Sequence, residues 1–109
     1  MVSSRYNAPS PIRHLSDKDI VRSARVSQTS PKVIRHELIH PGLLESVQPY
    51  VNPEILEHKR KSSSHPPVDV LYHKGHYILT DGNHRAAADL LERRMTRAKV
   101  LYDRTFGSK

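Results

Sequence analysis

The chain has 109 residues, with 18 Lys and Arg against 11 Asp and Glu, a net charge of +7 and a sequence pI near 10.0. This length suits a single domain, and the basic balance favours polyanionic partners, chiefly nucleic acid. The absence of cysteine excludes disulfides and thiolate sites. No apolar run reaches the roughly 18 residues of a membrane span, and the N-terminus has no secretory signal, so we expect a cytoplasmic protein without a membrane partner.

The N-terminal third predicts a loose arm and one short helix. Met1–Pro11 is polar and rich in proline and serine, which is typical of a mobile arm. Asp17–Val26 has apolar residues at helical spacing, and Ser16 is in position to cap that helix. We therefore expect three parts: an N-terminal arm with a short helix at residues 1–32, the main domain at 33–103 and a tail at 104–109.

The segment Val33–Ile39 fits either a strand or a helix, and the choice matters because it contains an HExxH motif, His36-Glu37-Leu38-Ile39-His40. On a helix, this motif places two imidazoles and a glutamate as zinc hydrolases require. However, Pro41 follows directly, and the residue before a proline is disfavoured in helical geometry. We therefore favour a strand with exposed histidines and keep the zinc hydrolase as a remote alternative.

The middle of the chain predicts short helical elements. Leu43–Tyr50 fits one or two helical turns. Asn52 or Pro53 then opens a second helix, because proline is favoured in a first helical turn. This helix ends in a basic cluster whose charge suits the C-terminal end of the helix dipole. Lys59 and Lys61 in that cluster are also candidate ligands for a phosphate.

The C-terminal half predicts two strands, a helix and a closing strand. Val68–Tyr72 is apolar and β-branched, His73–Gly75 makes a turn, and His76–Thr80 is a second strand. Helical periodicity runs from Asn83 to Met95, and Ala98–Tyr102 returns to a strand pattern. This alternation indicates an α/β (α+β) fold.

The junction Asp81-Gly82-Asn83-His84-Arg85 has the composition of a phosphate-binding loop. A helix N-terminus offers unpaired N–H groups and the positive end of the dipole, and Gly82 allows a ligand to approach the backbone. His84 and Arg85 add donors. Asp81 would repel a bare phosphate and fits better as a metal ligand, a base or a helix cap, whereas Asn83 suits a cap. The alternative is a plain turn with solvated side chains.

Three further basic residues, Arg93, Arg94 and Arg97, come at the end of the predicted helix. Positive charge is favourable at a helix C-terminus for structural reasons alone. Together with Lys59 and Lys61, these arginines could also form a surface that follows the phosphates of DNA.

The stretch HPPVDVLYHKGHY, followed by DGNHRAAADLLERRMTRAKVLY, resembles the C-terminal half of sulfiredoxin. The same fold occurs in the N-terminal domains of ParB-type partition proteins, in ParB-like nucleases and in free-serine kinases. The resemblance covers Pro66–Tyr102 and extends back to Val33. It implies a small mixed sheet with helices, and a nucleotide site with Gly82, His84 and Arg85 at the phosphates.

One position departs from the family pattern. Sulfiredoxins carry a cysteine where this chain has Asn83, so the sulfinic-acid repair that uses the thiol is excluded here. ParB proteins place a metal-binding glutamate near this position, and an asparagine is a weaker ligand.

Two functions of different classes stay open. The first is an enzyme that binds ATP or a related nucleotide with Mg²⁺ and hydrolyses or transfers a phosphoryl group, or that cuts DNA. Asp81 would then bind the metal or take a proton, and Glu37 would be a second carboxylate if its strand lies near the loop. The second is a non-catalytic module that holds a nucleotide, DNA or a protein partner, as in a phage or plasmid accessory protein. The scarcity of carboxylates near the loop favours binding.

Overall fold

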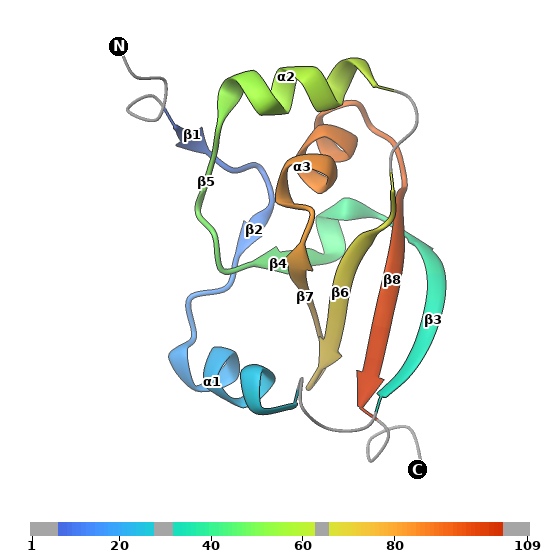
Figure 1. Cartoon of the computed structure of the whole chain (residues 1–109). Coiled ribbons are helices and arrows are strands. Elements are labelled where there is room, and N and C mark those ends of the chain that lie inside the picture. Colours follow the sequence, from blue (N-terminus) through green and yellow to red (C-terminus); the bar gives the residue numbers. More distant parts are fainter. Residues whose placement is uncertain (1–6, 28–31, 63–65, 104–109) are drawn as a thin grey trace.

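The computed structural model describes residues 7–27, 32–62 and 66–103. These residues form an α/β fold with a six-stranded mixed sheet, in the order β2-β4-β7-β6-β8-β3, and a two-stranded sheet of β1 and β5 (Figure 1). The α/β class and the mixed sheet are therefore confirmed. The strands are β1 Ala8–Pro9, β2 Arg13–His14, β3 Lys32–Ile39, β4 Leu44–Ser46, β5 Tyr50–Val51, β6 Val68–His73, β7 His76–Asp81 and β8 Thr96–Asp103. The helices are α1 Lys18–Ser27, the 3₁₀ turn η2 Pro41–Leu43, α2 Pro53–Lys61 and α3 Asn83–Leu91.

The centre of the sheet is the hairpin of β6 and β7. Its two turn residues, Lys74 and Gly75, have φ values of 51° and 85°. Positive φ at both positions gives a tight turn whose twist matches that of the flanking strands. The two predicted strands are confirmed, and each extends one residue further than expected, so that His73 and Asp81 belong to strands.

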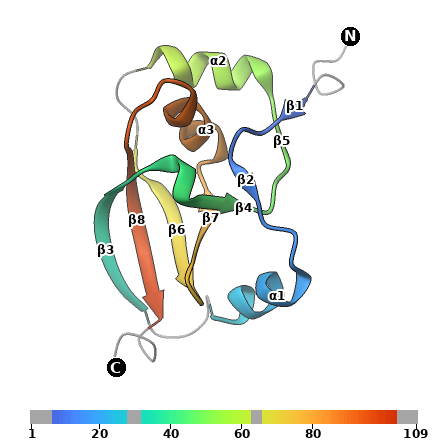
Figure 2. The same cartoon turned by 180° about the vertical axis from the view of Figure 1, so that it is seen from behind.

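Helices cover opposite faces of this sheet. Val70 and Leu71 are successive residues of β6, so their side chains point to opposite faces. Val70 packs in the larger core with Ala86 and Ala87 of α3, whereas Leu71 packs in the smaller core with Ala24 of α1. Figures 1 and 2 show α2 and α3 at one end of the sheet and α1 at the other. No helix in the described ranges is long and apolar enough to cross a bilayer.

The N-terminal segment is part of the domain, which differs from the expected loose arm. Ala8–Pro9 pairs with β5, and Ile12 and Leu15 are buried. Although the segment is mostly polar, Ile12 packs in the larger core and Leu15 in the smaller core. Helix α1 begins as predicted to within a residue, but its cap is Asp17 and not Ser16, because the Asp17 carboxylate accepts from the backbone of Asp19 and Ile20. The start of the arm and the tail, residues 1–6 and 104–109, lie outside the described residues.

The helical turns predicted for Leu43–Tyr50 are wrong. The chain makes only the 3₁₀ turn η2 and then pairs as β4, parallel to β7, followed by the short β5. Leu44 and Ser46 are fully buried on either side of Glu45, whose side chain keeps a small exposed fraction. This strand has only three residues, and an alternation of buried and exposed side chains over so few positions cannot be recognised in the sequence.

The HExxH motif begins on a strand and not on a helix, so it lacks the helical geometry that the zinc hydrolase alternative requires. His36 belongs to β3, an edge strand that pairs only with β8 in the described sheet. His40 lies beyond the end of that strand, where its Nδ1 accepts a hydrogen bond from the N–H of Gly42 at 2.9 Å. Within the described ranges, no three His, Cys, Asp or Glu side chains are grouped to hold a metal ion.

Helix α3 ends at Leu91, four residues before the predicted end at Met95. The N–H of Arg93 bonds to the Leu90 carbonyl at 3.2 Å, and that of Arg94 bonds to the Asp89 carbonyl at 2.8 Å. This is a Schellman closure, in which the residue after the cap takes a left-handed conformation that glycine favours. Here that residue is Arg93, with φ of 58°.

We predict that Arg93→Gly stabilises the protein by up to about 1 kcal/mol, because glycine has no Cβ to oppose positive φ. Chemical denaturation measures the free energy of unfolding. Arg93→Ala is the matched control, since it removes the same charge but keeps the Cβ. Equal stabilities of the two variants would show that the backbone conformation carries no cost.

Candidate functional site

The loop between β7 and α3 exposes the start of a helix. Gly82 occupies the N-cap position in a left-handed conformation, with φ of 98°, and no side-chain cap hydrogen bond is formed there within the described residues. The first backbone N–H groups of α3 therefore lack a side-chain acceptor. The predicted capping roles of Asp81 and Asn83 are both wrong: Asp81 ends strand β7 with its side chain 74% exposed, and Asn83 is the first residue of α3.

Gly82 is required for steric reasons. A Cβ at this position would lie 2.7 Å from Cγ1 of Val68 on the neighbouring strand β6. The backbone passes directly over Val68, which fixes where α3 begins relative to the sheet. The positive φ would strain any other residue there as well.

Asn83 anchors the loop. Its side chain is buried, accepts a hydrogen bond from the Ser46 hydroxyl at 2.6 Å and donates one to the Gln48 side-chain oxygen at 2.7 Å. These partners lie 37 and 35 residues away in sequence, so no local pattern could have indicated them. Asn83, predicted as a phosphate ligand, thus has its side chain engaged by β4 and the segment after it.

His84 ties the loop to α2. Its Nε2 accepts a hydrogen bond from the backbone N–H of Asn52 at 2.9 Å. Since a backbone N–H can only donate, the ring proton of neutral His84 must lie on Nδ1. Burial, and then the nearby charge of Lys59, lower the pKa of His84. The residue is therefore a neutral donor near physiological pH.

Helix α2 directs Lys59 toward the loop. It starts as predicted, with Pro53 at its first position and the Asn52 side chain accepting from two amides of the first turn. Arg60 turns to α3, where its Nε lies 2.6 Å from Glu92. Lys61 is 76% exposed and lies 3.7 Å from Glu57. Of the two lysines predicted at the phosphates, the structure brings Lys59 to the site and leaves Lys61 outside it.

Arg85 points into the same site with part of its guanidinium unpaired. Its side chain is 17% exposed, and NH2 lies 3.7 Å from a carboxylate oxygen of Asp81 and 3.5 Å from the carbonyl of Pro67. Its Nε is buried without a hydrogen-bond partner among the described residues. Buried donors are normally paired, so this nitrogen is an exception to the usual pattern.

These groups surround one open concavity with a volume of about 220 Å³. It is predominantly polar. It is lined by Gln48, Ile55, Lys59, Thr80, Asp81, Gly82, Asn83, His84 and Arg85. All five residues of the predicted loop are therefore brought together, with one lysine from a helix more than twenty residues earlier in the chain.

Glu37 does not join this site. Its strand β3 is separated from β7 by β6 and β8, and its carboxylate accepts a hydrogen bond from the Tyr102 hydroxyl. Burial and that carboxylate raise the pKa of Tyr102. The prediction that Glu37 lies near the loop as a second catalytic carboxylate is therefore wrong, because its strand lies at the far edge of the sheet.

Asp69 is the carboxylate residue that pairs with Asp81 across the sheet. A β-bulge in the β6–β7 hairpin leaves Asp69 directly opposite Asp81. Opposite residues of an antiparallel pair have their Cβ atoms about 5 Å apart. The sequence did not indicate Asp69, because the bulge shifts the register by one residue.

The three arginines after α3 lie in different local settings. Arg93 follows the helix end. Arg94 lies 3.2 Å from the buried Asp89 carboxylate and donates to the Ser62 carbonyl, so it holds the helix end in place. Arg97 lies on β8 and lines a separate concavity with His36. Arg93 and Arg97 are exposed, and DNA contact through these arginines stays a prediction.

The sequence matches no protein-family model and no curated protein. Its structure is similar to the crystal structure of sulfiredoxin from Arabidopsis thaliana, with 17% sequence identity and a TM-score of 0.48. The match covers 68% of this chain and 94% of that chain.

We predict that His84 makes the protein less stable in mild acid. Because folding lowers the pKa of His84, the unfolded chain binds the proton more readily, and stability falls as the pH drops through the ordinary value of 6.5. Denaturation from about pH 7.5 to about pH 5.5 should show a shallower loss for His84→Gln, which can accept from Asn52 without titrating. The other histidines are common to both proteins, so equal slopes would contradict the assignment.

Proposed function

We propose that this protein binds the phosphate groups of a nucleotide such as ATP at the start of α3. The observation that carries this proposal is the convergence of Lys59, His84 and Arg85 with the uncapped N–H groups of α3 on one polar concavity. A helix N-terminus with added basic donors is a recurrent way of holding phosphate.

The donors differ in kind, which suits a polyphosphate. Lys59 contributes a mobile point charge, and Arg85 a planar guanidinium that can bind two oxygens. His84 contributes a neutral N–H whose direction is set by the bond from Asn52. Because His84 and Arg85 are partly buried, their hydrogen bonds to an anion are less weakened by water than bonds on an open surface.

Asp81 is the one carboxylate among the lining residues, and it supports a bound Mg²⁺. Mg²⁺ is usually held by one or two carboxylates together with substrate phosphates. Asp81 is exposed at the rim of the concavity, and Asp69 lies opposite it in the sheet register. The metal would turn the repulsion between Asp81 and a phosphate into attraction.

Turnover would use the same groups. Arg85 and Lys59 would stabilise charge on the transferred phosphoryl group, and Asp81 would act through the metal or as a base. The distance of Glu37 from the loop weakens a two-metal nuclease mechanism, which needs several carboxylates. Binding is therefore the primary proposal, and phosphoryl transfer or hydrolysis is its catalytic extension.

We predict that Lys59→Ala and Arg85→Ala each lower ATP affinity about 10- to 100-fold, the usual cost of losing a charge-assisted hydrogen bond. Isothermal titration with Mg²⁺ present measures the change. Lys61→Ala is the matched control, because it removes the same charge from the same helix at a position that faces solvent. Equal losses in Lys59→Ala and Lys61→Ala would reduce the effect to net charge and refute the site.

We predict opposite effects of Asp81→Asn with and without metal. Without Mg²⁺, the variant should bind ATP more tightly than the wild type, because a negative charge beside the phosphates is removed. With Mg²⁺, it should lose most of the enhancement that the metal gives the wild type. A variant that responds to Mg²⁺ as the wild type does would exclude Asp81 as the metal ligand.

A further inference from the structure

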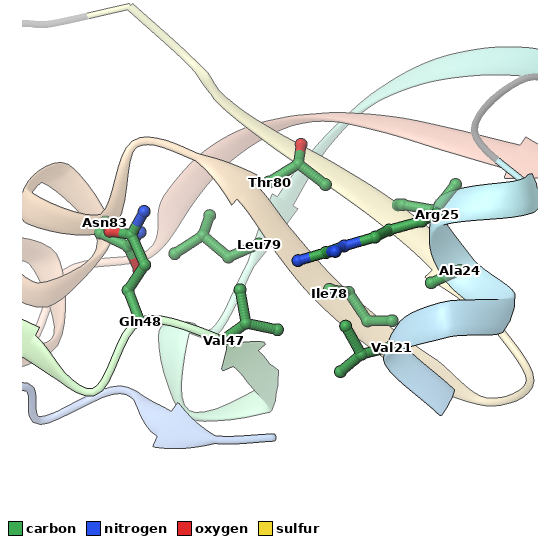
Figure 3. A pocket seen from close by; sticks show the side chains of 10 residues that line it. Val21, Ala24, Arg25, Val47, Gln48, Ile78, Leu79, Thr80 and Asn83 are labelled. Carbon is green, nitrogen blue, oxygen red and sulfur yellow. The ribbon is translucent and has the colours of Figure 1, made fainter. Parts of the chain in front are cut away.

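A second pocket, of about 150 Å³, lies between α1 and the hairpin strands (Figure 3). Most of its exposed lining is apolar, with Val21 and Ala24 from α1 facing Leu71 and Ile78 from the sheet. Ala24, Leu71 and Ile78 are almost fully buried, so the floor of this pocket is a fixed part of the smaller core. An engineered apolar cavity of comparable size, about 150 Å³, admits a benzene ring.

The apolar pocket adjoins the proposed phosphate site. Three residues, Gln48, Thr80 and Asn83, line both. Asn83 and Gln48 are hydrogen-bonded to each other where the two spaces meet. A single ligand with an anionic end and an apolar end could therefore occupy both spaces.

Arg25 gives this pocket a specific chemistry. Figure 3 shows its side chain extending from α1 across the pocket toward Leu79 and Thr80. Within the described part of the chain, no carboxylate forms an ion pair with Arg25. A planar guanidinium beside an apolar wall is suited to stacking on an aromatic ring.

We infer that this pocket receives the base of the nucleotide whose phosphates bind at the start of α3. The inference rests on the proposed function and specifies its ligand as a nucleoside phosphate rather than free polyphosphate. The apolar side chains of the pocket cover one face of the base, and the Arg25 guanidinium stacks on the base. The polar edge of the base faces Gln48 and Thr80, where the Gln48 oxygen is already engaged and its amide N–H groups are left to donate.

The test compares ATP, GTP, CTP and UTP with inorganic tripolyphosphate by isothermal titration on the full chain. At least one nucleotide should bind the wild type at least about 10-fold more tightly than tripolyphosphate. Arg25→Ala should remove most of that difference while leaving tripolyphosphate affinity unchanged. Arg22→Ala is the matched control, since it removes the same charge from an exposed position of α1 that does not line the pocket.

Val47→Trp provides a second variant that does not disturb the core. Val47 lines the pocket and is 38% exposed, so a larger side chain can block the space without entering the buried floor. It should lower nucleotide affinity to that of tripolyphosphate.

The inference is overturned if nucleotides and tripolyphosphate bind equally, or if neither variant affects nucleotide affinity. It is also overturned if Ile55→Ala on α2 lowers nucleotide affinity while Arg25→Ala does not, because the base would then lie on the other side of the phosphates. In these cases tripolyphosphate still binds and the phosphate site stands. Failure of all five compounds to bind would refute the proposed function and, with it, this inference.

Discussion

The candidate site depends on the close passage of Gly82 over Val68. Since a Cβ would lie 2.7 Å from the Val68 side chain, only glycine lets the chain leave β7 here and begin α3 at once. That start places Asn83 against the segment after β4 and His84 against the N-cap of α2. The two helices are thereby held together around one concavity. Lys59 reaches it from α2, while the Arg60–Glu92 ion pair joins the outer sides of the helices.

Much of the fold could be predicted from local patterns. The hairpin strands β6 and β7, the start of α2 at Pro53 and the strand β3 follow from apolar alternation, turn residues and proline. The errors occur where tertiary contacts override local preference. Burial in the sheet made a strand of Leu44–Ser46, and a hydrogen-bonded closure ended α3 at Leu91 despite helical periodicity beyond it. A few apolar residues sufficed to join the expected N-terminal arm to the domain.

The site was likewise predictable only where it depends on local sequence. The loop from Asp81 to Arg85 is continuous in sequence, so its composition alone indicated a helix N-terminus with basic donors. Its supports come from distant segments, and sequence reasoning could not choose Lys59 over Lys61 without the register of α2. The carboxylates required the sheet order: Glu37 lies at the far edge, and a bulge sets Asp69 opposite Asp81.

The most direct test of the account is a tripolyphosphate titration followed by amide chemical shifts in ¹⁵N-labelled protein. Binding at the start of α3 predicts saturable shifts concentrated in the backbone N–H groups from Gly82 to Arg85, with a smaller change at Asn52 through its bond to His84. Shifts spread over the exposed basic residues, without saturation, would mean that net charge alone attracts the anion. The loop at the start of α3 would then be a structural turn and not a phosphate site.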